Sequence, residues 1–360
     1  MDSIRLARRH ILSAFALLVA LGFLALPLHA APPTMRWSQL PPIPDAEGFA
    51  APFAGASGGG LIVAGGANIP ENKWADVFVK KWYDSVFLFN PAKGRWTSTT
   101  FKLPRTLGYG VSATIGDRVI CVGGSDATQH YRDVFALRLQ GESIVMDALP
   151  ALPKPCANAC GAAIGSTVFI AGGIETSTST TALPTFWSLD LAASEPRWRE
   201  LEPCPGSARM LAVAGVFEGS FFLFSGAALT AGADGKPVRE YLRDAWRYTP
   251  GKGWKRLADL PRAAVAAPSP AAAFGGAGLL LVSGDDGANV RSPQNERHPG
   301  FPRNSLAYDV RADQWTIAGE TPISRATAPT VQWQQSYVIP NGEVRPRVRT
   351  PEIWMMNEVP

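Results

Sequence analysis

The residues with the clearest potential for chemistry lie in a charged segment near the C-terminus. This segment reads Asn-Gly-Glu-Val-Arg-Pro-Arg-Val-Arg-Thr over residues 341–350. Glu343 and Arg349 are six positions apart on either side of Pro346, so a proline turn can bring the two side chains together. A carboxylate can act as a general base, and a guanidinium can bind a carboxylate through two parallel hydrogen bonds. The competing interpretation is an ordinary surface ion pair, which stabilises a protein little.

This segment begins at the last copy of a pattern that recurs along the chain. In each of six copies a short apolar run ends in a small or polar residue followed by glycine, and the glycines are 49 to 58 residues apart. A period of this size predicts that one supersecondary unit is repeated. Small residues are expected at these ends because they let neighbouring backbones approach near an axis and let the chain turn out of the strand. The glycines are Gly66, Gly124, Gly173, Gly226, Gly284 and Gly342.

Each repeat also carries the signals of four short strands. A strand of small and β-branched residues precedes the apolar run, an aromatic strand follows it, and a tryptophan marks the last strand in four repeats. Short strands with frequent turn signals predict an all-β protein, and six such units predict a six-bladed β-propeller. Residues 35–40 have the pattern of a fourth strand and residues 350–355 that of a third strand. We therefore expect the N-terminal strand to complete the last blade and close the propeller.

A second set of charged residues follows the opening Leu-Pro or similar pair of the repeats. Five of the six repeats place a cation there, and these positions could surround the mouth of a central pocket that attracts an anion. We expect Arg105, Arg209 and Arg325 to be the substrate-binding members of this set. The alternative is that an arginine after proline is simply a solvated turn residue. The five cations are Arg105, Lys154, Arg209, Arg262 and Arg325.

Residues 1–30 have the composition of a secretory signal peptide. Arg5, Arg8 and Arg9 precede an apolar run over residues 11–26, and a small-residue cleavage site follows near Ala30. The pair Arg8-Arg9 leaves twin-arginine export open, and a retained membrane anchor is the alternative, although the run is short for a span. We therefore expect residues 31–360 to form one exported, periplasmic domain with no membrane attachment once the signal is removed.

Charge and metal-binding residue types narrow the function further. The chain has a formal net charge of only +4, which gives no reason to expect a nucleic-acid partner. Outside the signal region the only histidines are His130 and His298, too few for a copper oxidase site, and no Cys/His spacing suggests zinc. We expect no cofactor. Cys121 is expected to be a buried small hydrophobe, while pairing among the other three cysteines (Cys156, Cys160 and Cys204) cannot be read from sequence.

Two resemblances to known families follow from these residues. The Gly-Gly ends with their downstream aromatic residues resemble kelch repeats, a fold that hosts enzymes and binding modules alike. Residues 341–350 are similar to the most distinctive segment of the exported bacterial N-acetylneuraminate epimerases, the sialic acid mutarotases. Residues 53–67 with 79–81, and residues 308–322, also look similar to that family. Its Glu is the proposed proton acceptor and its last Arg the site partner, so the resemblance implies these roles for Glu343 and Arg349.

The resemblance implies an isomerase that interconverts the α and β anomers of N-acetylneuraminate. The partner would be a small acidic sugar, and a homodimer is compatible with it. The family's counterpart of residues 341–350 lies mid-chain, so this chain looks cyclically permuted, which a propeller tolerates. One open alternative is a non-catalytic kelch propeller that binds glycan or protein, in which Glu343 should point away from the pocket. Another is a mutarotase for a different acidic sugar.

Overall fold

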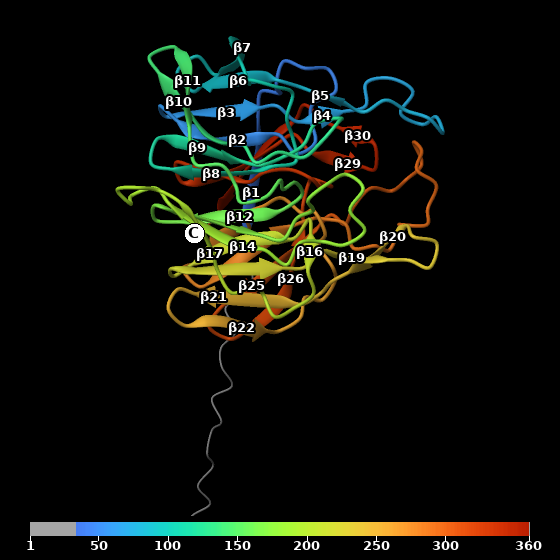
Figure 1. Cartoon of the computed structure of the whole chain (residues 1–360). Coiled ribbons are helices and arrows are strands. Elements are labelled where there is room, and N and C mark those ends of the chain that lie inside the picture. Colours follow the sequence, from blue (N-terminus) through green and yellow to red (C-terminus); the bar gives the residue numbers. More distant parts are fainter. Residues whose placement is uncertain (1–33, 360) are drawn as a thin grey trace, which may run out of the picture. The chain divides into compact units, whose positions relative to one another are not determined.

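The computed structural model describes residues 34–359, and all regular secondary structure in this range is β-strand (Figure 1). The expected signal peptide over residues 1–30 lies outside the described residues. No helix of the part described is long and apolar enough to cross a membrane. The architecture is that of a β-propeller, as the strand pattern predicts.

Most strands belong to six antiparallel sheets of four strands each. Three of these sheets contain β2 (Phe53–Ser57), β3 (Gly60–Ala64), β6 (Ser85–Asn90) and β7 (Arg95–Lys102); β8 (Val111–Ile115), β9 (Arg118–Val122), β10 (Val134–Gln140) and β11 (Ser143–Ala148); and β12 (Cys160–Ile164), β13 (Thr167–Ala171), β14 (Phe186–Asp190) and β15 (Trp198–Glu200). The next two contain β17 (Val213–Phe217), β18 (Ser220–Phe224), β21 (Ala245–Thr249) and β22 (Gly253–Leu257); and β23 (Ala272–Phe274), β24 (Gly278–Val282), β25 (Asn304–Asp309) and β26 (Gln314–Glu320).

The remaining four-stranded sheet joins strands from both ends of the described range. It has the order β27 (Val331–Trp333), β28 (Ser336–Pro340), β31 (Ile353–Glu358) and β1 (Met35–Leu40). Strand β1 pairs antiparallel with β31 over its whole length, from Met35 opposite Glu358 to Leu40 opposite Ile353. An N-terminal strand thus lies beside a C-terminal one, at the outer edge of the sheet.

Three smaller sheets extend from the ends of the larger ones. They are the pair β4 (Ala67–Asn68) and β5 (Lys81–Trp82); the three strands β16 (Arg209–Met210), β19 (Ala227–Ala231) and β20 (Pro237–Tyr241); and the hairpin β29 (Glu343–Arg345) and β30 (Val348–Arg349). In Figure 1 these elements lie toward the same, right-hand side of the view.

The tryptophans of the outer strands tie neighbouring sheets together. The indole N–H of Trp96 donates to the carbonyl of Pro41 at 2.9 Å, and that of Trp198 donates to the carbonyl of Pro150 at 2.8 Å. Trp254 and Trp315 make the same kind of bond, to backbone carbonyls more than 50 residues earlier in the chain. Each ring therefore fills apolar space while its polar tip is satisfied, which explains why tryptophan recurs at this point of the repeat.

The small residue and glycine that end each apolar run have a common backbone conformation. All twelve residues of the six doublets have positive φ, from 54° at Ser225 to 108° at Gly124. A Cβ on Gly65 would lie 2.2 Å from the carbonyl oxygen of Leu107, and one on Gly66 would lie 2.7 Å from the Cβ of Phe49. Left-handed backbone and close approach together select glycine here, as the sequence predicts.

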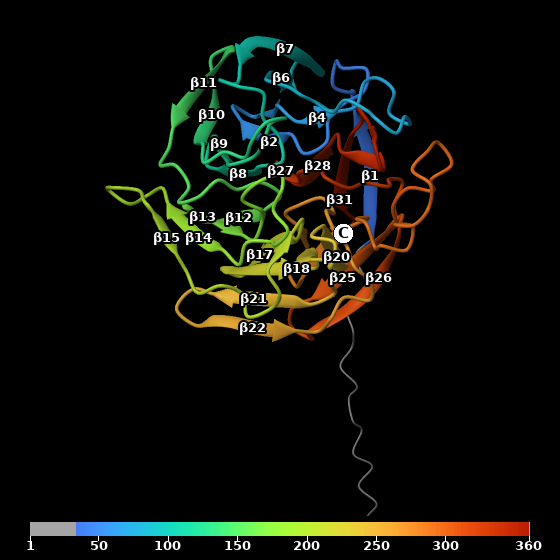
Figure 2. The ribbon, with the colours of Figure 1, turned by 45° about the vertical axis from the view of Figure 1, so that its right-hand side comes forward.

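Figure 2 shows the larger sheets following one another around a common centre. A closed ring of backbone hydrogen bonds surrounds that centre in the described part. Each N–H of the ring donates to the carbonyl of the preceding member, at 2.6–3.0 Å, and the first residue bonds to the last. All six members have φ between 46° and 60°. The ring links all six sheets at the axis and gives the adjacent pocket a rigid floor. Its members are Ala51, Tyr109, Asn158, Leu211, Ala266 and Thr327.

Candidate functional site

A cavity of about 420 Å³ opens beside this ring, on the side of the small sheets. The hairpin β29–β30 supplies Glu343 and Arg349 to its wall, and the β4–β5 connection supplies Phe78 and Lys80. Strand β20 and the long loop over residues 285–303 form further parts of the wall, as expected for a loop that overhangs the pocket. Leu211, Ala266 and Thr327 of the hydrogen-bonded ring line its base.

Glu343 and Arg349 form an ion pair inside this cavity. They are opposite each other in the β29–β30 hairpin, and Oε1 of Glu343 lies 2.8 Å from Nη2 of Arg349. The side chain of Arg349 is 4% exposed and that of Glu343 is 17% exposed, so the pair is held away from bulk water. Thr327 donates a longer hydrogen bond of 3.4 Å to Oε2 of Glu343. The proline turn therefore brings the two residues together, and the ion pair that they form does not lie on the surface.

Backbone contacts hold the hairpin in this place. The N–H and C=O of Glu343 both pair with Ala326, and the amide of Asn341 donates to the carbonyl of Thr350 at 3.1 Å. Gly342 has φ 96°, and a Cβ on it would lie 2.8 Å from the carbonyl oxygen of Ala326. The Asn-Gly doublet thus serves the repeat and also fixes the base of the hairpin that carries the ion pair.

The electrostatic environment keeps Arg349 charged. Burial alone would lower the pKa of its guanidinium, but the negative charge of Glu343 and the hydroxyl of Tyr109 outweigh burial and raise the pKa. Only Nη2 is engaged by Glu343. Nε and Nη1 are buried and have no hydrogen-bond acceptor among the described residues. Arg349 therefore keeps unused N–H donors beside the cavity that it lines, and hydrogen bonds from a guanidinium to a carboxylate are strong.

The cavity lining carries more positive than negative charge. Its cations are Lys80, Arg239, Arg347 and Arg349, and its acids are Asp285 and Glu343. Arg347 is held in place because its Nη1 donates to the carbonyls of Lys73 and Ala75, both at 3.1 Å, while its guanidinium lies over the ring of Phe78. An anionic ligand is therefore favoured, as the sequence predicts, although the cations differ from those expected.

The wall formed by β20 and the 285–303 loop carries polar side chains. The hydroxyl of Tyr241 donates to Oδ2 of Asp285 at 2.8 Å, and burial together with the charge of Asp285 raises the pKa of Tyr241, so the phenol stays protonated. Nδ1 of His298 accepts the N–H of Gly300, which leaves the proton of the neutral ring on Nε2. These groups offer acceptors and donors suited to sugar hydroxyls.

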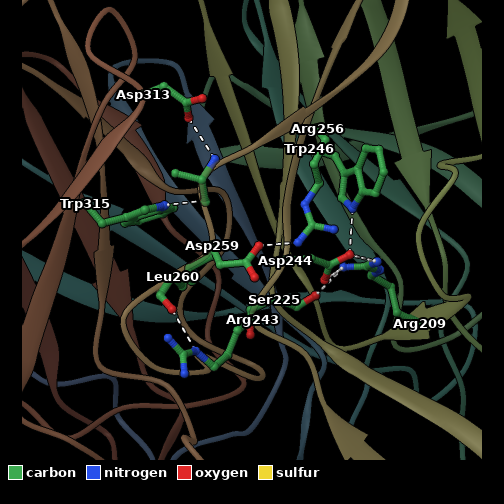
Figure 3. A network of polar contacts seen from close by, with 11 residues as sticks. Arg209, Ser225, Arg243, Asp244, Trp246, Arg256, Asp259, Leu260, Asp313 and Trp315 are labelled. Carbon is green, nitrogen blue, oxygen red and sulfur yellow. Dashed lines mark hydrogen bonds and ion pairs between the residues drawn. The ribbon is translucent and has the colours of Figure 1, made fainter.

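The structure places Arg209 away from the cavity, which corrects the expectation of a cation ring at its mouth. Arg209 is 2% exposed, and its two terminal nitrogens bind the two oxygens of Asp244 at 2.7 and 2.6 Å (Figure 3). The indole of Trp246 also donates to Asp244. Burial alone would raise the pKa of Asp244, but the hydrogen bonds and charge of Arg209 lower it. Arg209 is thus part of a saturated buried network between strands.

Arg325 and Arg105 also lie outside the lining of the cavity. Arg325 is fully buried, with Nη2 3.2 Å from Oε2 of Glu352, and burial lowers its pKa. Arg105 pairs with Asp133 at 3.1 Å and lies over the ring of Tyr131. At these two positions the guanidinium is held by a carboxylate or aromatic ring of a neighbouring connection and does not line the cavity.

The structure also shows the surroundings of the cysteines and of the other metal-ligating residue types. No group of three or more metal-ligating side chains occurs within residues 34–359. Cys121 is fully buried in β9, as expected, and all four cysteines are free thiols. Sequence reasoning gave no site role to Lys80, Arg347, Tyr241 or Asp285. Lys80 and Arg347 lie in segments that resemble the epimerase family, whereas no sequence signal marks Tyr241 or Asp285.

The N-terminal part of the described chain, which supplies Phe78 and Lys80 to the cavity, is similar to a known protein family. Residues 30–146 match a family model, and this matched range does not contain the Glu343 hairpin. That family is N-acetylneuraminate epimerase. The resemblance to N-acetylneuraminate epimerases drawn from residues 341–350 and 53–81 is thereby confirmed.

Two curated N-acetylneuraminate epimerases illustrate the degree of similarity. The protein of Haemophilus influenzae (strain PittEE) is 26% identical over 229 residues, which cover 56% of this chain and 57% of that protein. The protein of Salmonella typhi is 43% identical over 106 residues, which cover 26% of this chain and 27% of that protein. The chain thus spans a little over half the length of the Haemophilus influenzae protein.

A solved structure extends the likeness of fold. The structure of YjhT superposes with a TM-score of 0.59 over 74% of this chain and 83% of that chain, at 13% sequence identity. At this identity the likeness concerns the arrangement of strands alone.

Proposed function

We propose that the protein is a mutarotase that interconverts the α and β anomers of N-acetylneuraminate. The observation that carries the proposal is the buried Glu343–Arg349 pair, which faces a cationic cavity in a chain similar to N-acetylneuraminate epimerases. A pair that combines a carboxylate base with a guanidinium that binds carboxylates suits an acidic sugar.

The proposed reaction needs no group beyond the side chains of the cavity and water. Glu343 takes the proton of the anomeric hydroxyl, the anomeric oxygen forms a carbonyl, and the bond from the anomeric carbon to the ring oxygen breaks. The ring oxygen takes a proton from water. Rotation next to the carbonyl presents its other face, and the reverse steps close the ring as the opposite anomer. Arg349 holds the sugar carboxylate and stabilises negative charge that develops on the oxygens.

The position of Glu343 favours this proposal over a non-catalytic kelch module. A pure binding module gives no reason for Glu343 to face the pocket, whereas Glu343 lines it and is held by Arg349 and Thr327. A mutarotase for another acidic sugar would use the same pair, so the choice of substrate rests on the similarity to N-acetylneuraminate epimerases.

Proton NMR of freshly released α-N-acetylneuraminate tests the proposal. The α and β anomers have separate signals, so the wild-type protein should shorten the time to anomeric equilibrium relative to buffer alone. An unchanged time course at micromolar protein would exclude the enzymatic function.

The number of blades, the closure of the propeller and the location of the protein also belong to what we propose. We infer a six-bladed, kelch-type propeller in which β1 completes the last blade, because six four-stranded sheets surround one ring and β1 pairs with β31. We also propose export to the periplasm from the signal-like residues 1–30. A nucleic-acid or membrane partner has no support in the charge of the chain, and a homodimer stays a prediction.

A further inference from the structure

Lys80 occupies an unusual position at the edge of the cavity. It directly precedes β5, and its Nζ lies 3.8 Å from the ring centre of Tyr109 and 4.6 Å from that of Trp82. No ion pair joins Lys80 to a carboxylate in the part of the chain described. Two aromatic faces orient the ammonium without neutralising its charge. Its full positive charge is therefore available to a ligand of the cavity that it lines.

The two rings that hold Lys80 are themselves fixed. Tyr109 belongs to the axial hydrogen-bonded ring, where its N–H bonds to Ala51 and its carbonyl accepts the N–H of Asn158. Trp82 pairs with Ala67 in the β4–β5 ladder, next to the doublet that ends the first apolar run. The ammonium is thus positioned by rigid backbone, although Lys80 itself follows a long connection.

Tyr109 also connects Lys80 to the ion pair. Its hydroxyl raises the pKa of Arg349, and its ring face contacts the ammonium of Lys80. Arg349 keeps Nε and Nη1 without acceptors while its Nη2 is engaged by Glu343. Since Glu343 offsets the charge of Arg349, a bound anion needs a second cation that has no acid of its own. Lys80 meets that requirement.

We propose that Lys80 is a specificity-determining residue that binds the substrate carboxylate together with Arg349. It selects acidic sugars over uncharged ones. This inference rests on the proposed function, because it assigns the substrate class to the same cavity.

The neighbouring lysine provides a matched control. Lys81 is exposed, pairs with Asn68 in the β4–β5 ladder and does not line the cavity. Its ammonium lies over the ring of Tyr83 at 5.1 Å, so it has the same kind of aromatic contact outside the cavity. Lys81→Met removes the same charge from the chain and leaves the cavity unchanged.

The test compares N-acetylneuraminate with its methyl ester, which has the same ring but no negative charge. Lys80→Met should raise KM for the acid by roughly tenfold to a hundredfold, the range for one lost charge-assisted hydrogen bond, and leave KM for the ester unchanged. Lys80→Arg should restore most of the affinity for the acid. Lys81→Met should behave as wild type with both compounds.

Two results would overturn the assignment of Lys80. One is an unchanged KM for the acid in Lys80→Met. The other is an equal loss for acid and ester, which would indicate a structural role. If the wild-type protein does not accelerate anomer exchange, the proposed function fails. The role of Lys80 is then tested by calorimetric binding of the acid and the ester to wild type and Lys80→Met. A charge-selective loss in Lys80→Met would support the assignment, whereas equal or absent binding of both compounds would overturn it.

Discussion

The carboxylate of Glu343 and the guanidinium of Arg349 are 2.8 Å apart on facing strands of one short hairpin. Arg349 is almost fully buried while Glu343 keeps a small exposed fraction toward the cavity. The same contact therefore does two things. It keeps Arg349 charged, and it fixes the base within reach of a sugar that enters from the open side.

Replacing Arg349 by lysine should separate charge from geometry. Lysine keeps the positive charge but lacks the planar guanidinium, so it cannot donate to Glu343 and to a sugar carboxylate in the same directions. We expect KM for N-acetylneuraminate to rise by about tenfold or more, while the melting temperature stays close to wild type. Anomer exchange followed by NMR at several sugar concentrations measures this. A KM equal to that of wild type would contradict the role of Arg349 in carboxylate binding.

Asp244→Asn should destabilise the fold without a specific effect on the sugar. Arg209 would lose its charged partner in a site where it is 2% exposed, and breaking such a buried pair costs about 3 kcal/mol. Urea denaturation measures the loss. At temperatures where the variant is folded, KM for the acidic sugar should equal that of wild type. A raised KM with unchanged stability would indicate that Arg209 contributes to substrate binding and would contradict its structural role.

Gly342→Ala should impair activity more than a strained substitution elsewhere. The new Cβ would meet the carbonyl oxygen of Ala326 at 2.8 Å and displace the hairpin that carries Glu343. Gly319→Ala is the control, because Gly319 has a similar φ of 82° and no atom within 4 Å of an added Cβ. Both variants should lose about 1 kcal/mol or more of stability from backbone strain, but only Gly342→Ala should lose most of its exchange rate. Equal activity in both would contradict this role of the hairpin base.

Tyr131→Phe should lower stability in a pH-dependent way. Burial alone would raise the pKa of Asp126, but hydrogen bonds from Tyr131 and Thr128 outweigh it and lower the pKa to about 2 from 3.8. A lowered folded-state pKa stabilises the fold above the unfolded value and loses this effect as pH falls toward 2. The variant should therefore be about 1 kcal/mol less stable than wild type at pH 7. The difference should shrink as the pH approaches 2, which thermal unfolding at both pH values can measure. A pH-independent difference would contradict the assignment.

Features that depend on backbone conformation and repetition could be predicted from sequence. The doublets at Gly66 and Gly342 mark positions where positive φ and close packing leave room for little else, and Trp96 marks an outer strand. The Glu343–Arg349 contact was also predictable, because both residues lie within one short turn.

Other features were not predictable because they depend on contacts between distant segments. Arg209 and Arg325 follow the repeat pattern, yet they pair with Asp244 and Glu352, which lie 35 and 27 residues away in the sequence. Arg347 reaches Lys73 across 274 residues. The axial ring uses only backbone groups, so its members, which include alanine, tyrosine and asparagine, have no shared side-chain chemistry to recognise.

The most direct test of the central claim is the anomer exchange rate of Glu343→Gln against wild type. Glutamine preserves the size of the side chain and cannot take a proton, so the exchange rate should fall by about a hundredfold or more while the melting temperature changes little. Proton NMR of freshly released α-N-acetylneuraminate gives both rates under one condition. Equal acceleration by the two proteins would contradict the assignment of Glu343 as the base.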